Sequence, residues 1–222
     1  QALVDARGLE CRVWRNQNTE VEHAYFSVEE LPDDPSKLYL TGYEEETAKV
    51  RSYDTYTIGE EDKRVVGIAD GALKGDQTIT YFAVPHSDEF VYVGKEAFAD
   101  SIVEHVDLFD SVTSIGAGAF RNCAQLKEIT IPASVTEIGE NAFAGCSGLT
   151  SVTIPSGVKR IDYGTFSGCN NLSAISLPDS INYISHYAFD GTAYYKNESN
   201  WENGALYIGN ALVAAKCYGD DE

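Results

Sequence analysis

Residues 139–161 read GENAFAGCSGLTSVTIPSGVKRI, and the next 23 residues read DYGTFSGCNNLSAISLPDSINYI. Both stretches keep a Phe, a Gly-Cys pair, a Leu, an aliphatic-Pro step and a closing Ile at the same offsets. Agreement at several independent positions in one register indicates an internal repeat. Such repeats are the signature of architectures in which one structural unit stacks on the next.

The repeat extends well beyond these two stretches. Several columns of residues keep the 23-residue step: Phe120, Phe143, Phe166 and Phe189; Val112, Val135, Val158 and Ile181; Ile115, Ile138, Ile161 and Ile184; Cys123, Cys146 and Cys169; Leu126, Leu149 and Leu172. Towards the N-terminus the same pattern continues with small slips of the register. We therefore expect about five full coils and a partial sixth within residues 65–192.

The apolar pattern of a single coil predicts short strands. In LTSVTI (149–154) the last two apolar residues alternate as in a strand with one buried face, and Pro155 ends the strand because it lacks an amide donor. One coil has too few apolar residues to offset the entropy of ordering it, so stacked coils must share their stability. The sequence therefore predicts a solenoid of 23-residue coils, made mostly of short strands and irregular turns.

The two ends of the chain depart from the repeat, as is typical of units that cap a solenoid. Residues 193–222 are predicted to form a C-terminal cap and tail, with a strand pair that turns at Gly209-Asn210. The residues expected to cover the end of the core are Trp201, Leu206, Ile208, Leu212 and Val213.

At the other end, residues 38–64 are predicted to form an N-terminal cap. Short strands are expected at residues 37–43 and 47–50, around an acidic turn. Residues 1–37 carry no period, so no structure is predicted for them, and the stretch from Pro32 to Pro35 marks the expected boundary.

The elements L-x-x-I-x-I-P, V-x-x-I-G, A-F and G-C at period 23 resemble the bacterial BspA-like (treponemal-type) leucine-rich repeats, over about residues 38–213. The stretch NWENGALYIGNALVAA (200–215) resembles the usual C-terminal ending of that family. The resemblance implies a right-handed leucine-rich-repeat solenoid of α/β type. It also implies a module of a bacterial cell-surface or secreted protein, and some members of the family are associated with adhesion to host or neighbouring cells.

The net charge of the chain argues against some classes of binding partner. Its 222 residues include 35 acidic and 16 basic residues, for a net charge of -19. Such a surface repels phosphate groups, which argues against nucleic acids and anionic membranes as partners. No apolar run approaches the roughly 18 residues of a membrane helix, and no signal peptide is visible. Because the chain begins at Gln1 without a Met, we expect a processed or trimmed product.

The cysteines are predicted to be structural. Cys123, Cys146 and Cys169 share one column and should stack about 5 Å apart, but parallel side chains in an odd number do not pair evenly as disulfides. We therefore expect a column of small buried residues. A metal site is not expected, because tetrahedral zinc needs four donors and no second ligand type shares the column. Cys11 and Cys217 belong to opposite ends of the solenoid and are not expected to pair.

No catalytic constellation stands out. A Ser/His/Asp set could be composed from Ser151, His105 and Asp107, and Glu128 with Asp107 could imitate a carboxylate pair. No strained elbow, oxyanion loop or orienting partner accompanies either set, so a solvated surface is the preferred interpretation. The sequence thus predicts a protein that is not an enzyme and that has no catalytic residues, metal or cofactor.

Two surfaces remain as candidate binding sites. The outward positions of one strand column form a hydroxyl-rich face, which could hydrogen-bond a sugar or a partner strand, or could be ordinary solvated sheet. Its candidate residues are Glu128, Thr130, Ser151, Thr153 and Ser176. The second surface is richer in Tyr and Arg, which are enriched at interface hot spots. Its candidate residues are Lys159, Arg160, Tyr163, Tyr183, His186 and Tyr187. The alternative for the second set is that Ala193 to Tyr195 fold back and bury the rings.

Two functions are compatible with these sequence features. The first is an extracellular recognition or adhesion module that binds a protein or glycan at a cell surface or matrix through an exposed face of the solenoid. The alternative is a structural spacer of a larger cell-surface or secreted protein, with no ligand of its own. A binding module should expose an aromatic or apolar patch, whereas a spacer should not.

Overall fold

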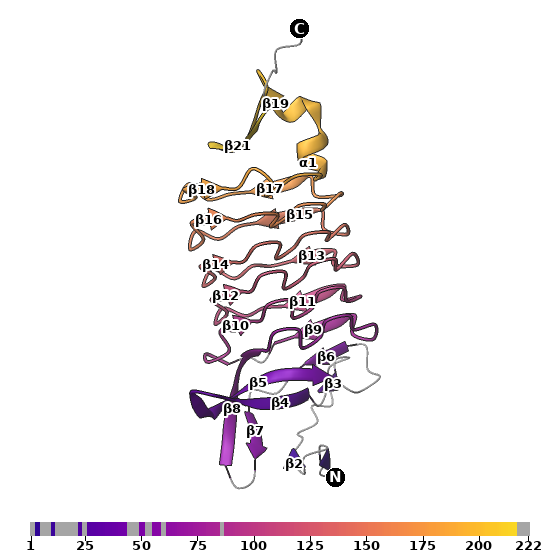
Figure 1. The fold of residues 1–222 in the computed structure, drawn as a ribbon, viewed down its shortest axis with the longest axis vertical. Helices are drawn as coiled ribbons and strands as arrows, with labels where there is room; N and C mark the ends of the chain where they lie inside the picture. Colours follow the sequence, from indigo (N-terminus) through magenta and orange to yellow (C-terminus); the bar gives the residue numbers. More distant parts are fainter. Residues whose placement is uncertain are drawn as a thin grey trace.

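Each coil of the chain contributes one short strand to each of two columns. The computed structural model describes residues 26–43, 61–84 and 87–216, together with the backbone of short strands at 3–4, 10–11, 22–23, 49–51 and 55–58. The coils stack one upon another along the long axis of the molecule (Figure 1). The fold is a β-solenoid of about six coils of about 23 residues, as the repeat predicted.

The V-x-x-I-G element of each repeat forms the first column of strands. This column contains β8 (Glu61–Ile68), β10 (Tyr92–Val93), β12 (Ser114–Ile115), β14 (Glu137–Ile138), β16 (Arg160–Ile161) and β18 (Tyr183–Ile184). The pairing is parallel and follows the repeat, since Val93 pairs with Ile115 and Ile115 with Ile138. These three side chains point into the core, so their neighbours point outward.

The L-x-x-I-x-I element forms the second column of strands. This column contains β9 (Tyr81–Ala83), β11 (His105–Asp107), β13 (Glu128–Ile129), β15 (Ser151–Thr153) and β17 (Ala174–Ser176). Its strands also pair in parallel, for example Val106 with Ile129 and Val152 with Ile175. The labels of the two columns lie on opposite sides of the coil stack in Figure 1.

A ladder of phenylalanines runs through the core. Phe98, Phe120, Phe143, Phe166 and Phe189 are all at most 1% exposed. Successive rings from Phe98 to Phe189 stack nearly parallel, with centroids 5.1 to 5.5 Å apart. This spacing is close to the distance between paired strands, so one ring per coil continues the stack without a gap.

The cysteine column is buried and unpaired, as the sequence predicted. Cys123, Cys146 and Cys169 are fully buried and free. Each thiol donates a hydrogen bond to the carbonyl of a phenylalanine in the preceding coil, at 3.0 to 3.1 Å between Sγ and O. Burial raises the pKa of Cys123 to about 11 and that of Cys169 to about 12. The predictions about Cys11 and Cys217 concern side chains outside the described residues.

The turn that carries the phenylalanine depends on a left-handed backbone. Asn122, Gly145 and Gly168 occupy equivalent positions and have φ angles of 60°, 75° and 73°. Glycine adopts this region without a steric penalty, and asparagine tolerates it better than most residues do. The repeated Gly-Cys pair therefore combines the turn with the buried thiol that follows it.

Two of the strands near the N-terminus lie where the sequence predicted short strands. The strands expected at 37–43 and 47–50 are β5 (Asp34–Tyr43) and β6 (Lys49–Arg51), but they enter different columns. β5 pairs in parallel with β8, and β6 pairs in parallel with β9. β5 and β6 therefore supply one strand to each column, as a coil does.

The expected boundary at residue 37 falls within β5. β4 (Phe26–Leu31) pairs antiparallel with β5, and Phe26 and Val28 are buried in the same core as the coils. β4 thus belongs to the same sheet as β5 and β8. The remaining N-terminal strands are β1 (Leu3–Val4), β2 (Glu10–Cys11), β3 (Glu22–His23) and β7 (Thr55–Ile58).

The C-terminal segment packs against the end of the core formed by the last coils. Its elements are α1 (Ala193–Lys196), the 3-10 helix η1 (Glu198–Asn200), β19 (Trp201–Glu202), β20 (Ala205–Ile208) and β21 (Ala211–Ala215). β20 and β21 form the predicted strand pair around Gly209-Asn210. Leu206, Ile208 and Val213 are buried, as expected.

The prediction for Leu212 is wrong. Its side chain is 54% exposed, because it pairs with Tyr207 on the outer face of the sheet, while Val213 takes the inner face. Trp201 is only partly buried against the core. The α/β description is also too broad, since α1 is four residues long and is the one α-helix in the described part of the chain. No helix among the described residues is long and apolar enough to cross a membrane.

Candidate binding surface

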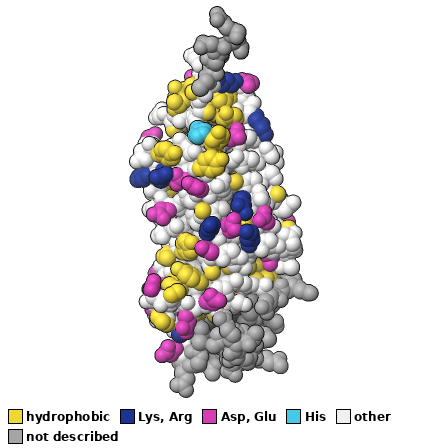
Figure 2. Space-filling view, in the orientation of Figure 1, with side chains coloured by type: hydrophobic (Ala, Val, Ile, Leu, Met, Phe, Trp, Pro, Cys, Tyr) yellow, Lys and Arg dark blue, Asp and Glu magenta, His cyan; other side chains and the backbone are white. Residues whose placement is uncertain are grey.

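Four aromatic side chains form an exposed cluster near the C-terminal end of the first strand column. We call Tyr163, Tyr183, His186 and Tyr187 the aromatic ridge. The three tyrosines are 51%, 50% and 45% exposed. On the face shown in Figure 2, hydrophobic side chains gather around a histidine towards the C-terminal end. The alternative that residues 193–195 bury these rings is therefore wrong.

Residues 193–195, which in that alternative would cover the rings, pack elsewhere. Tyr194 and Tyr195 lie against the end of the core, and the Tyr195 ring meets Trp201 edge-on at 5.2 Å. The hydroxyl of Tyr194 donates to the carbonyl of Tyr207 at 2.7 Å. These contacts hold the segment over the last coil and leave the ridge open.

The rings of the ridge support one another. Tyr163 and Tyr187 meet edge-to-face with centroids 5.4 Å apart, and the ring of His186 lies 3.8 Å from that of Tyr187. The Arg160 guanidinium lies 5.0 Å from the centre of the Tyr183 ring, within cation–π range. Side chains fixed in this way lose less entropy when a partner binds.

Asp162 holds Arg160 in place. Both Nε and Nη2 of Arg160 donate to Oδ1 of Asp162, at 2.8 and 2.6 Å. This ion pair raises the pKa of the guanidinium. The Lys159 ammonium instead donates to the carbonyl of Ser156 at 2.8 Å. Arg160, held by Asp162, thus supports the ridge through its contact with Tyr183.

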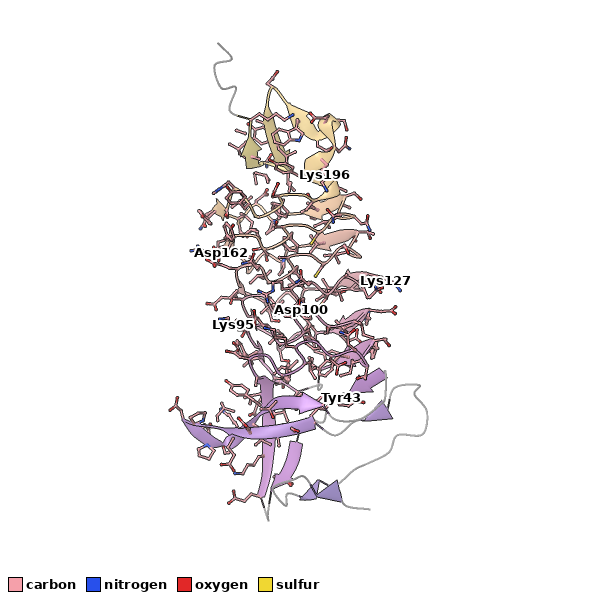
Figure 3. All side chains as sticks on the ribbon, turned by 45° about the vertical axis from the view of Figure 1, so that its right-hand side comes forward. Tyr43, Lys95, Asp100, Lys127, Asp162 and Lys196 are labelled. Atoms are coloured by element: carbon pink, nitrogen blue, oxygen red, sulfur yellow. The ribbon has the colours of Figure 1, made fainter. Side chains whose placement is uncertain are left out.

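The hydroxyl-rich face lies on the other strand column. Glu128, Thr130, Ser151, Thr153 and Ser176 are all exposed on β13, β15, β17 or the residues next to them. Asp162 and Lys127 mark the two columns and lie on opposite sides of the stack in Figure 3. The predicted site residues therefore form two separate surfaces.

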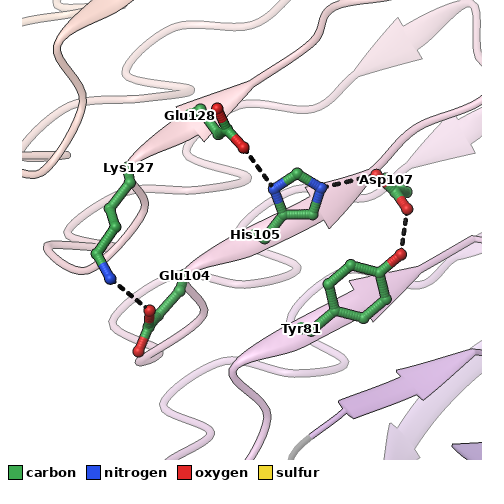
Figure 4. A network of polar contacts seen from close by, with 6 residues as sticks. All are labelled: Tyr81, Glu104, His105, Asp107, Lys127 and Glu128. Carbon is green, nitrogen blue, oxygen red and sulfur yellow. Dashed lines mark hydrogen bonds and ion pairs between the residues drawn. The ribbon is translucent and has the colours of Figure 1, made fainter. Parts of the chain in front are cut away.

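A polar network occupies the N-terminal part of the hydroxyl-rich face (Figure 4). Nε2 of His105 lies 2.7 Å from Asp107, and Nδ1 lies 3.4 Å from Glu128. The hydroxyl of Tyr81 donates to Asp107, and its ring stacks on the imidazole at 5.3 Å. Beside it, Lys127 pairs with Glu104 at 2.6 Å.

This network does not form the Ser/His/Asp set that could be composed from the sequence. Ser151 lies on β15, and β13 stands between it and β11, which carries His105 and Asp107. Within the described residues, no group of three or more His, Cys, Asp or Glu side chains could hold a metal ion. The network instead ties neighbouring strands together across the sheet surface.

The sequence analysis did not identify Tyr81 as a surface residue of interest. The signal that could have identified it is its aromatic ring at an outward position of β9. The sequence analysis also did not identify a shallow groove of about 600 Å³ that crosses β10, β12, β14 and β16 beside the ridge. Arg160 and Lys159 line one end of this groove and Tyr92 lines the other. The groove and the ridge thus meet at Arg160.

Comparison with known proteins places the chain among bacterial repeat proteins. The sequence model described as the BspA type leucine-rich repeat region matches residues 91–212 in six copies. No curated protein matches the sequence.

Two solved structures share the fold. A leucine-rich cell surface protein from Faecalibacterium prausnitzii is similar with a TM-score of 0.68 and 27% identity, over 87% of this chain and 58% of that one. The leucine-rich repeat protein of T. pallidum is similar with a TM-score of 0.56 and 26% identity, over 72% of this chain and 83% of that one. The chain therefore spans little more than half the length of the Faecalibacterium protein.

Proposed function

Because the chain belongs to the BspA-type leucine-rich repeat family, we propose that it is a non-enzymatic recognition module that binds a protein partner outside the bacterial cell. In this proposal the aromatic ridge is the centre of the interface, and no metal or cofactor takes part. In this proposal the solenoid is right-handed and has a cap at each end. The cell-surface origin of the Faecalibacterium relative supports the location.

The exposure of three supported tyrosines is the observation that carries the proposal. Tyr163, Tyr183 and Tyr187 are three of the six most exposed large hydrophobic side chains in the described residues. Tyr supplies a large contact area with few rotatable bonds, and together with Arg it is enriched at binding hot spots. The coil itself does not require a ring at the position of Tyr163, since the equivalent positions of two other coils hold Ala117 and Glu140.

The charge of the chain predicts how binding should depend on salt concentration. With a net charge of -19, the protein attracts basic surfaces at long range, and salt screens this attraction. Binding that depends on the ridge, by contrast, rests on contact between apolar and cation–π groups and should persist at physiological salt.

The test is binding of the purified chain to an array of matrix proteins and mucins at low and physiological salt. A Tyr163→Ser, Tyr187→Ser variant removes the ridge contacts, and Tyr207→Ser is the matched control, because Tyr207 is similarly exposed on the C-terminal sheet. The proposal expects saturable binding that survives physiological salt, falls at least tenfold in the double variant and is unchanged in the control. An array without such binding would favour the spacer, and equal loss in both variants would remove the ridge from the interface.

A further inference from the structure

We propose that the groove across β10, β12, β14 and β16 binds a neutral, linear oligosaccharide. The proposal goes beyond the protein-binding function of the ridge and does not depend on it. It rests on the shape of the groove, on the side chains at its two ends and on the balance of charge along it.

Close packing of the coils creates the groove. A Cβ atom at Gly139 would lie 2.5 Å from the backbone nitrogen of Ala117, and one at Gly116 would lie 2.6 Å from that of Lys95. Glycine is therefore required at both positions, and no side chain rises from them. With the small Ala117 between them, these residues leave a hollow of about 600 Å³ open to solvent.

The groove is longer than a single sugar ring. Three steps between neighbouring strands separate β10 from β16, two of them between paired strands, which corresponds to about 14 Å at the usual strand spacing. One further step, between the paired strands β16 and β18, reaches Tyr183. Equivalent outward residues follow this line, since Tyr92 pairs with Ser114, Ser114 with Glu137, and Arg160 with Tyr183. A chain of a few sugar units lying along the solenoid axis matches this span.

Aromatic rings stand at both ends of the line. The Tyr92 ring lies 6.2 Å from that of Tyr39, and its hydroxyl donates to Asp70 at 3.1 Å. At the other end, Tyr183 is half exposed and carries Arg160 over its ring. An aromatic face is an apolar surface with a polar edge, so it suits the C–H face of a sugar ring, which is rimmed by hydroxyls.

Polar groups between the rings can both donate and accept hydrogen bonds. The Arg160 guanidinium carries five N–H donors in a fixed fork, two of which are donated to Asp162, so three remain, and Asp162 supplies the adjacent carboxylate acceptors. Ser114 and Thr136 contribute hydroxyls to the same lining. Neighbouring hydroxyls of a sugar act as donor and acceptor at once, so an ion pair that presents both functions recognises them.

The charges that line the groove balance. Lys159 and Arg160 provide two positive charges, and Glu137 and Asp162 provide two negative ones. A strongly anionic glycan would meet no excess of positive charge there, and the -19 charge of the whole chain would repel it. The groove therefore favours an uncharged ligand.

An extended polypeptide fits the groove less well. Peptides that add to a sheet need a free strand edge for main-chain hydrogen bonds. β10 pairs with both β8 and β12, and β12 with both β10 and β14. β14 and β16 are neighbours without a strand pairing between them, and β16 pairs with β18, so each strand of the floor has a strand beside it on both sides. Recognition must come from side chains, which is how hydroxyl-rich sugars are bound.

The experiment uses titration calorimetry of the full chain with cellohexaose, maltohexaose and chitohexaose, and with a hyaluronan hexasaccharide as the anionic comparison. Thr136→Trp fills the groove from an exposed position, and Thr153→Trp places the same ring on the opposite strand column. Arg160→Gln is a second groove variant that leaves the backbone unchanged, and Tyr163→Ser tests the ridge separately. Melting curves establish that each variant is folded.

The proposal expects at least one neutral hexasaccharide to bind, with a loss of tenfold or more in Thr136→Trp and in Arg160→Gln. Thr153→Trp and Tyr163→Ser should stay within twofold of the wild type. No binding of any neutral hexasaccharide at millimolar concentration would overturn the proposal. The proposal would also be overturned if only the anionic sugar bound, or if the groove variants left sugar binding unchanged. It would likewise be overturned if a protein partner that itself occupies the groove displaced the sugar. A protein partner lost only in the ridge variant would leave the proposed function intact whatever the sugars do.

Discussion

Phe143→Ala should destabilise the protein strongly, because the ring stands in the middle of the phenylalanine ladder. Phe143 has no exposed surface and stacks on Phe120 and Phe166 at 5.3 Å on each side. Truncation of a buried Phe to Ala costs about 3–5 kcal/mol, from lost burial and the cavity that remains. Each aromatic pair adds about 0.5–1.5 kcal/mol beyond burial, so two lost pairs place the expected cost towards the upper end of that range.

The assay is equilibrium unfolding in urea, followed by the fluorescence of Tyr and Trp. Phe143→Leu keeps most of the apolar volume and loses both ring pairs, so we expect it to cost about 1–3 kcal/mol. Tyr163→Ala is the exposed control, and it should change stability by at most about 0.5 kcal/mol. A cost below about 1 kcal/mol for Phe143→Ala would contradict the claim that the ladder supports the stack.

Two further predictions concern the packing between coils. Gly139→Ala should lower the free energy of unfolding by about 1–3 kcal/mol, because its Cβ would lie 2.5 Å from the backbone of Ala117 and the coils would have to shift. Gly42→Ala is the control in the same urea-unfolding assay. Its Cβ would have its nearest contact at 3.9 Å, so this variant should be neutral or slightly stabilising. Burial raises the pKa of Cys123 to about 11 and of Cys169 to about 12, so these thiols stabilise the fold fully below their unfolded pKa near 9 and lose that contribution as the pH rises towards 11–12. In a Cys11→Ser, Cys217→Ser background, iodoacetamide at pH 8 should therefore leave the three column thiols unmodified until urea unfolds the chain, and rapid labelling of the native protein would refute their burial.

The sequence predicted most of the coil, because each column repeats a local requirement. The columns at Phe143 and Ile138 are core positions in every coil, and the pairing of β12 with β14 follows the 23-residue register. The cysteine column could be interpreted correctly from chemistry alone, since three parallel thiols do not pair evenly.

What the sequence could not predict depends on contacts between segments. The strands at 37–43 and 47–50 look like a hairpin locally, but their partners β8 and β9 lie further along the chain. Leu212 was assigned to the core by its hydrophobicity, while alternation along β21 places Val213 there instead. The exposure of Tyr163 and Tyr183 depends on where residues 193–195 pack, which no repeat column specifies.

The groove was missed for a related reason. The glycines that follow β10, β12 and β14 are visible in the sequence, but the hollow beside them depends on how closely the neighbouring coils approach. The contacts around Tyr81 could not be predicted from the repeat. Tyr81 precedes its strand partner His105 by 24 residues, whereas equivalent residues elsewhere are 23 residues apart.

The most direct test of the proposed function is hydrogen exchange of the chain, alone and in complex with a partner identified on the array. A partner bound at the ridge should slow exchange of the amides around Tyr163 and between residues 183 and 187, and should leave β13, β15 and β17 unchanged. Protection confined to β13, β15 and β17 would contradict the proposal and would place binding on the hydroxyl-rich face.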